Sequence, residues 1–144
     1  MTRKEKYPDT DYFKYFNANP KNRITGDCIY RALSTALDIP YNQVVIELAE
    51  LHCKTGYCDE SLYSKYLESK GWVRYGCPKK SDNTRYTVKE WIRHECLGKS
   101  YYTNSVVAHA GTHHIIAIKD HKVHDIWNSS EEKLGVVWLK PKDR

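Results

Sequence analysis

The chain has 144 residues and a formal net charge of +5, a length that predicts one domain, spanning residues 1–144, with a substantial core. Its hydrophobic content of 40% excludes a disordered polar chain. No window approaches the roughly 18 apolar residues of a membrane helix, and the first residues lack the apolar region of an export signal, so we expect a cytoplasmic protein without a membrane partner.

The N-terminal segment, residues 1–21, is predicted to form a polar arm that carries an aromatic cluster. Tyr12, Phe13, Tyr15 and Phe16 have the spacing of a short helical turn, which would cover part of the core. Asn19-Pro20 is then expected to end this arm.

Four helices are predicted to follow, because apolar residues recur at helical spacing in four segments. These segments are residues 28–37, 41–54, 59–69 and a last one that opens at 87 and runs to about residue 96. Thr25 or Asp27 is expected to cap the first of them. Thr87 and Glu90 have the spacing of a capping box at the start of the last one. No strand is predicted before these helices end.

The remainder of the chain is predicted to form an antiparallel sheet. After Gly98 the sequence contains four short runs of β-branched and aromatic residues, 101–110, 114–119, 122–127 and 134–140, separated by turn residues. Asp120-His121 is predicted as a two-residue hairpin turn, because both residue types tolerate positive φ. The expected fold class is therefore α+β, with N-terminal helices packed on a C-terminal antiparallel sheet.

Cys28 raises the main chemical question, because it stands directly after Gly26-Asp27 and at the start of a predicted helix. A free cysteine commonly fills space in a protein core. A thiol at a helix N-terminus, in contrast, has a lowered pKa and is a better nucleophile. Both interpretations are open for Cys28 considered alone.

A base for Cys28 would have to come from a distant part of the chain. If Asp120-His121 is a two-residue turn, His114 and Asp125 are diagonal neighbours across the hairpin, about 7–8 Å apart at Cα. The competing pair is His113 with Asn128, directly opposite each other on the other face. Alternation does not decide between the two faces, because residues 115–118 are apolar on both sides.

An anionic tetrahedral intermediate also needs hydrogen-bond donors. The backbone N–H of Cys28 could supply one of them. The side-chain amide of Asn22, six residues upstream, is the candidate for the second.

The stretch TGDCIYRALSTAL, residues 25–37, resembles the nucleophile helix of papain-like cysteine peptidases. The likeness is to the Gly-Asp-Cys-Trp segment of calpains and the Asp-Gly-Asn-Cys-Leu-Phe-Arg-Ala segment of ovarian-tumour-type deubiquitinases. The resemblance implies a papain-like fold with Cys28 as nucleophile, His114 as base and Asp125 as the residue that orients it. Asn22 then takes the position of the oxyanion glutamine, although it is one methylene shorter. Thr25 stands where the deubiquitinases have Asp.

The whole chain is also similar to small papain-like proteins encoded by phages and prophages of Gram-positive bacteria. This resemblance implies the cytoplasm of a bacterium or of a phage-infected host cell, with a host protein as a target. The expected activity is that of a cofactor-free peptidase or isopeptidase, which cleaves a protein or peptide through a thioester. A papain-like acyl transferase would carry the same residues.

Two other classes of protein are compatible with the composition. Residues 70–93 carry seven Lys or Arg against Asp82 and Glu90, interleaved with aromatic residues. A solvated loop and helix face is the first interpretation of this pattern. The alternative is a surface that binds nucleic acid or an acidic partner on an inactive scaffold. The His and Cys residues at 52, 53, 58, 77, 94 and 96 are potential zinc ligands, but their spacing fits no standard zinc site, so no metal is expected.

Overall fold

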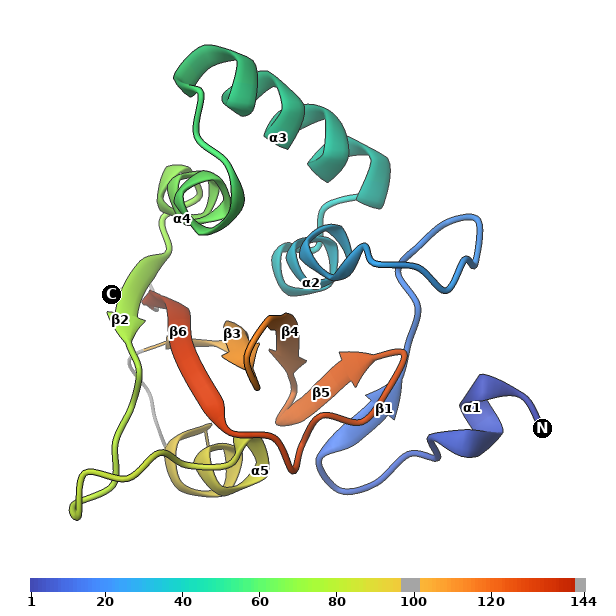
Figure 1. Cartoon of the computed structure of the whole chain (residues 1–144), viewed down its shortest axis with the longest axis vertical. Coiled ribbons are helices and arrows are strands. Elements are labelled where there is room, and N and C mark those ends of the chain that lie inside the picture. Colours follow the sequence, from blue (N-terminus) through green and yellow to red (C-terminus); the bar gives the residue numbers. More distant parts are fainter. Residues whose placement is uncertain (97–101, 142–144) are drawn as a thin grey trace.

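The computed structural model of the chain describes residues 1–96 and 102–141. Helices pack on both faces of a six-stranded mixed sheet with strand order β1-β5-β4-β3-β6-β2 (Figure 1). The strands are β1 (Phe13–Tyr15), β2 (Val73–Gly76), β3 (Tyr102–Ala110), β4 (His114–Lys119), β5 (Lys122–Asp125) and β6 (Leu134–Pro141). The α+β class predicted from the sequence is confirmed. Residue 101, where the first strand of the sheet was predicted to begin, lies outside the described residues.

Three of the predicted helices form almost as expected, the last one is divided into a short α-helix and a π-helical turn, and a short helix near the N-terminus was not predicted. The helices are α1 (Arg3–Lys6), α2 (Cys28–Leu37), α3 (Tyr41–Thr55), α4 (Asp59–Ser69), α5 (Val88–Trp91) and the π-helical turn η1 (Ile92–Cys96). Gly56 ends α3 in the left-handed region, with φ 74°, a conformation that glycine adopts without strain. Among the described residues, no helix has the length and apolar character needed to cross a membrane.

Two strands correct the sequence-based prediction. The aromatic cluster of the N-terminal arm forms β1 instead of a helical turn, and Phe13 is fully buried beside Val123 of the parallel strand β5. The edge of β5 offers this segment backbone hydrogen-bond partners, which favours the extended conformation. β2 is also unpredicted, and it pairs with β6. The sheet is therefore mixed, and it draws strands from both halves of the chain.

Both faces of the sheet carry a hydrophobic core. Ile115 and Ala117 of β4 belong to the core beneath α2, α3 and α4, whereas Ile116 and Ile118 belong to the core that includes α5. Figure 1 shows α2, α3 and α4 together on one side of the sheet and α5 on the other. A strand covered on both faces is apolar throughout, which explains why alternation could not orient this segment.

The hairpin between β4 and β5 has the predicted register. Asp120 and His121 adopt φ values of 52° and 66°, and Lys119 pairs with Lys122. Two successive residues at positive φ match the twist of the strands they join. As a consequence, Asp125 is the diagonal neighbour of His114.

The capping box at the start of α5 supports a first stability prediction. Thr87 Oγ1 accepts a hydrogen bond from the Glu90 N–H at 3.2 Å, and the Thr87 N–H donates to Glu90 Oε1 at 2.8 Å. We expect Thr87→Ala to lower the free energy of unfolding by about 1 kcal/mol, measured by urea denaturation. Thr2→Ala is the control, because the Thr2 side chain also accepts a hydrogen bond from the third residue of its helix, the Glu5 N–H, but α1 has no buried residue. Equal losses in both variants would contradict the prediction.

Candidate active site

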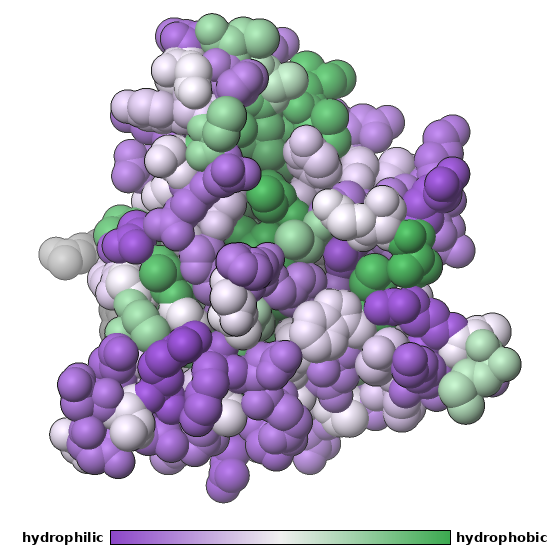
Figure 2. All heavy atoms as spheres, in the orientation of Figure 1, coloured by the Kyte–Doolittle hydropathy of each residue, from purple (hydrophilic) through white to green (hydrophobic). Residues whose placement is uncertain are grey.

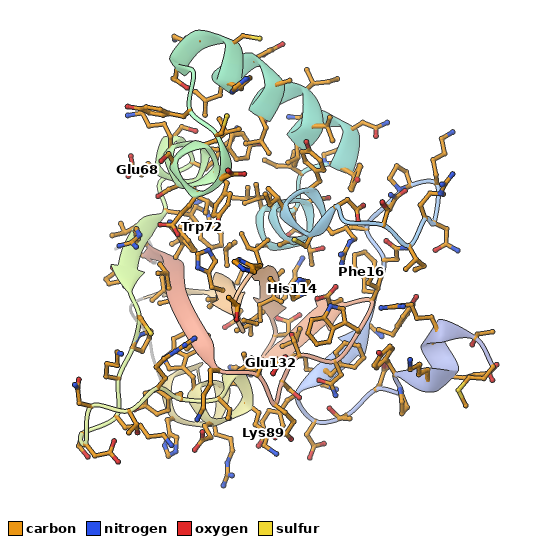
Figure 3. The ribbon with its side chains drawn as sticks, viewed as in Figure 1. Phe16, Glu68, Trp72, Lys89, His114 and Glu132 are labelled. Carbon is orange, nitrogen blue, oxygen red and sulfur yellow. The ribbon has the colours of Figure 1, made fainter. Side chains whose placement is uncertain are left out.

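The N-terminal end of α2 faces the beginning of β4. Cys28 is the first residue of α2 and is half-buried, and His114 is the first residue of β4. Ala32, Leu33 and Ala36 bury one side of α2 against the sheet, which fixes the helix over this strand. Figure 3 shows His114 in the space between α2 and the sheet.

The surroundings of the Cys28 thiol favour its ionised form. Burial opposes the negative charge, but the influence of the His114 ring and of the Ile115 backbone N–H outweighs it, and the pKa of Cys28 is lowered. The positive charge of Arg31 acts in the same direction. A lowered pKa increases the fraction of thiolate, the form in which a cysteine acts as a nucleophile.

His114 is held between this thiol and a buried carboxylate. Its Nε2–H donates to Oδ2 of Asp125 at 2.6 Å, and the Asp125 side chain is only 2% exposed. Burial disfavours the imidazolium, but the hydrogen bond to Asp125 and the influence of the nearby Cys28 raise the pKa of His114 to about 9. Because Asp125 takes Nε2, Nδ1 is the ring nitrogen left for the thiol. The indole of Trp127 packs against the imidazole with ring centroids 4.9 Å apart.

Arg31 connects Asp27, the residue before Cys28, to Asp125, the partner of His114. The sequence pattern alone did not lead to this arginine. Its guanidinium donates from Nε to Oδ1 of Asp27 at 2.7 Å and from Nη1 to Oδ1 of Asp125. All three side chains are at least nine-tenths buried. Oδ1 of Asp125 also accepts the Ile126 N–H at 2.7 Å, so both oxygens of this carboxylate are occupied. Asp125 is thereby fixed in position.

Asp27 directly precedes Cys28 but does not cap the helix with its side chain. Its Oδ2 accepts hydrogen bonds from Tyr41 Oη at 2.7 Å and from Asn19 Nδ2 at 2.9 Å. Burial opposes ionisation, yet these bonds and Arg31 lower the pKa of Asp27. The four-residue spacing of Asp27 and Arg31 was the signal available in the sequence, because such residues are neighbours on a helix.

The other sequence-predicted candidates lie around this constellation. Asn22 is exposed in the loop before α2, where its Oδ1 accepts from Asn17 Nδ2 at 3.5 Å; the described contacts include no bond from Asn22 to Cys28. His113 is exposed in the turn before β4. Asn128 lies beyond β5, and its Oδ1 accepts from Ser130 N at 3.0 Å and Ser130 Oγ at 2.6 Å. The described contacts therefore pair His114 with Asp125 and do not pair His113 with Asn128.

Several Lys and Arg side chains of the basic segment 70–93 form ion pairs with Glu residues of the same chain. Trp72 and Trp91 are buried and cannot stack on bases. Where both partners are described, four of the cations form ion pairs: Lys70 with Glu47, Arg74 with Glu60, Lys80 with Glu90, and Lys89 with Glu131. These contacts reduce the surface that the binding-protein hypothesis relies on.

Residues suited to metal binding are scattered in the part of the chain that the structure describes. There, no group of three or more His, Cys, Asp or Glu is arranged to hold a metal ion. His52 Nδ1 lies 3.6 Å from Cys58 Sγ, and it also lies 2.7 Å from the carbonyl oxygen of Tyr57. The side chain of Cys96 is outside the described residues.

Comparison with known family models, curated proteins and solved structures finds no match for this chain.

Proposed function

We propose that the protein is a thiol hydrolase, a peptidase or isopeptidase of papain-like type, with Cys28 as nucleophile, His114 as acid and base, and Asp125 as the residue that orients the imidazole. The observation that carries the proposal is that His114, hydrogen-bonded to the buried carboxylate of Asp125, lines the same cavity as the helix-terminal thiol of Cys28. A structural cysteine needs no such partners, whereas a nucleophilic cysteine needs a base that is itself oriented by a third group.

The proposed reaction begins with the thiolate of Cys28 attacking the carbonyl carbon of an amide. A sulfur–carbon bond forms, and the carbonyl electron pair moves to the oxygen. When the intermediate collapses, the carbon–nitrogen bond breaks, and the His114 imidazolium gives its proton to the departing amine. His114, now neutral, takes a proton from water, which attacks the thioester and releases the carboxylic acid and the thiolate.

The oxyanion formed in each step requires donors at the start of α2. The first N–H groups of an α-helix have no acceptor within the helix, and the positive end of the helix dipole lies there. The Cys28 N–H is suited to this role. Asn22 stays the candidate for the second donor, and its replacement by alanine would reduce turnover if the loop before α2 turns toward the substrate.

Support for a papain-like arrangement comes from the order and origin of the three groups. The thiol comes from the first residue of the central helix, the imidazole from the start of a strand that this helix covers, and the carboxylate from the next strand of the hairpin. The resemblance of residues 25–37 to the nucleophile helix of that superfamily points the same way.

The test is cleavage of a defined mixture of peptides that includes a lysine-linked isopeptide. New carboxyl and amino ends are identified by mass spectrometry after incubation with wild type, Cys28→Ala and Cys53→Ala. Cys53 is a matched control, because it is an exposed thiol on α3 that contributes to no pocket at Cys28. We expect cleavage products with wild type and Cys53→Ala only. If wild type and Cys28→Ala give the same peptides, the proposal is refuted.

Adding hydroxylamine distinguishes hydrolase from transferase. A thioester that resolves mainly with water yields free acids, with hydroxamates appearing in proportion to the added amine. A transferase would release little acid until an amine or alcohol acceptor is supplied.

A further inference from the structure

We infer that the acyl side of the substrate carries a bulky apolar side chain directly next to the reacting carbonyl, and that this side chain enters a cavity formed by α2, α3 and α4. The inference rests on the proposed thiol chemistry and adds the substrate class to it. It is argued from two cavities that meet at Cys28 and differ in their chemistry.

The first cavity, which we call the helical pocket, has a volume of about 470 Å³, within the usual range for small-ligand sites. Cys28, Gly26 and Asp27 border it at one end. Its apolar lining comes from three helices: Ile29, Val45, Leu48, Ala49, Leu62 and Tyr63. Figure 2 shows hydrophobic side chains gathered in a hollow over this part of the molecule, with hydrophilic residues around it. Such a lining favours an aliphatic or aromatic group.

The charges around the helical pocket add a second constraint. Asp27 and Asp59 belong to its lining, and the described lining includes no Lys or Arg. An acidic side chain buried there would find no cation to pair with. An apolar side chain meets no such penalty.

The second cavity, which we call the strand pocket, has a volume of about 400 Å³ and opens toward the start of β4. Glu60, His109, His113 and His114 give it a polar lining. Tyr63 lines both pockets, and its hydroxyl lies 2.6 Å from Nε2 of His109. Burial lowers the pKa of His109, so the neutral ring can accept this hydrogen bond and hold the tyrosine in place.

The position of His114 decides which half of the substrate occupies which pocket. The group that protonates the departing amine must lie within hydrogen-bond reach of it. His114 lines the strand pocket and is absent from the described lining of the helical pocket. The leaving group therefore occupies the strand pocket, and the acyl half, which stays bonded to Cys28, extends into the helical pocket.

The test compares two affinity labels, the chloromethyl ketones of N-acetyl-leucine and N-acetyl-glycine, which place the leucine or glycine side chain on the acyl side. The rate of Cys28 modification is followed by peptide mass spectrometry. We expect the leucine compound to react at least about tenfold faster, since a single methylene in an apolar pocket already gives about tenfold or more. Equal rates for the two compounds would overturn the inference.

Variants on α3 locate the effect. Ala49→Phe fills the helical pocket from an exposed position and should abolish the preference for leucine. Ile46→Phe adds the same ring at another exposed position of α3, outside the pocket, and should leave the preference unchanged. Loss of the preference in both variants would argue against the helical pocket. Should Ala49→Phe not fold, the ratio of the two wild-type rates still decides.

Iodoacetamide separates failure of this inference from failure of the proposed function, because it is too small to depend on either pocket. Rapid alkylation of Cys28 at low pH with equal chloromethyl ketone rates would reject the substrate class alone. Alkylation that follows an ordinary thiol would reject the proposed function itself.

Discussion

Replacing His114 with alanine is expected to move the pH midpoint of Cys28 alkylation upward, to about 8.5, the value of an ordinary thiol. The wild-type thiol has a lowered pKa, so its thiolate is present above that lowered value. The pKa of His114 is raised to about 9, so its imidazolium persists below that pH. Between these two pKa values the wild-type protein therefore contains a thiolate–imidazolium pair. His114→Ala removes the imidazolium, so the variant cannot form this pair.

The size of the effect can be bounded at pH 6. A thiol of pKa about 8.5 is then only about 0.3% ionised. A thiolate of low pKa is a weaker nucleophile, which offsets part of the difference in ionised fraction. We expect His114→Ala to slow alkylation by iodoacetamide at pH 6 by about an order of magnitude, measured by peptide mass spectrometry.

His113→Ala is the matched control, since this neighbouring imidazole is exposed. It should leave the midpoint unchanged. If His113→Ala instead produces the shift, the assignment of the base moves to His113. If wild type already has an ordinary midpoint, Cys28 is a structural cysteine and the binding-protein hypothesis gains weight.

Replacing Arg31 with methionine is expected to lower the free energy of unfolding by about 3–5 kcal/mol at pH 7. Arg31 is the cation that bridges the buried carboxylates of Asp27 and Asp125. Methionine fills similar space but leaves both carboxylates without their counter-charge. Urea denaturation monitored by tryptophan fluorescence measures the loss. Arg74→Met is the control, because Arg74 forms an exposed pair with Glu60 at 3.3 Å, a type of contact that contributes about 0–1 kcal/mol.

The pH dependence of this loss has a defined sign. In wild type the pKa of Asp27 is lowered, so its contribution to stability is present above the pKa of the unfolded chain and is lost as the pH falls through the folded value. Without Arg31, burial dominates and favours the protonated carboxyl. The native state of Arg31→Met then gains stability from binding protons, and the difference from wild type should shrink between pH 7 and pH 4. A loss that is no larger than that of Arg74→Met, or that grows on acidification, would contradict this account.

Local patterns were sufficient for most of the secondary structure around the site. The helical spacing of apolar residues after Cys28 and the turn chemistry of Asp120-His121 both act over a few residues, so α2 and the register of the β4–β5 hairpin could be predicted. That register makes Asp125 the diagonal neighbour of His114, and the structure brings the two side chains within hydrogen-bond distance.

Other features depend on partners that are far away in the sequence. Phe13 is in a strand because the edge of β5 pairs with it, and no spacing within residues 1–21 encodes that edge. Asn22 had the right position in the sequence, but the loop before α2 leaves its side chain exposed. Both cases reflect backbone and side-chain contacts that form only after the segments meet.

By itself, the sequence determined the α+β class, the helix that begins at Cys28 and the hairpin that carries His114 and Asp125, because periodicity and turn propensity are local properties of the chain. Only the tertiary structure decided that Arg31, which lies 94 positions from Asp125 in the sequence, bridges Asp125 to Asp27. It also decided that two cavities of different chemistry meet at the Cys28 thiol. The physical reason is that a buried charge network and a cavity both depend on which distant segments pack together and exclude water. Patterns within a few neighbouring residues do not specify that packing.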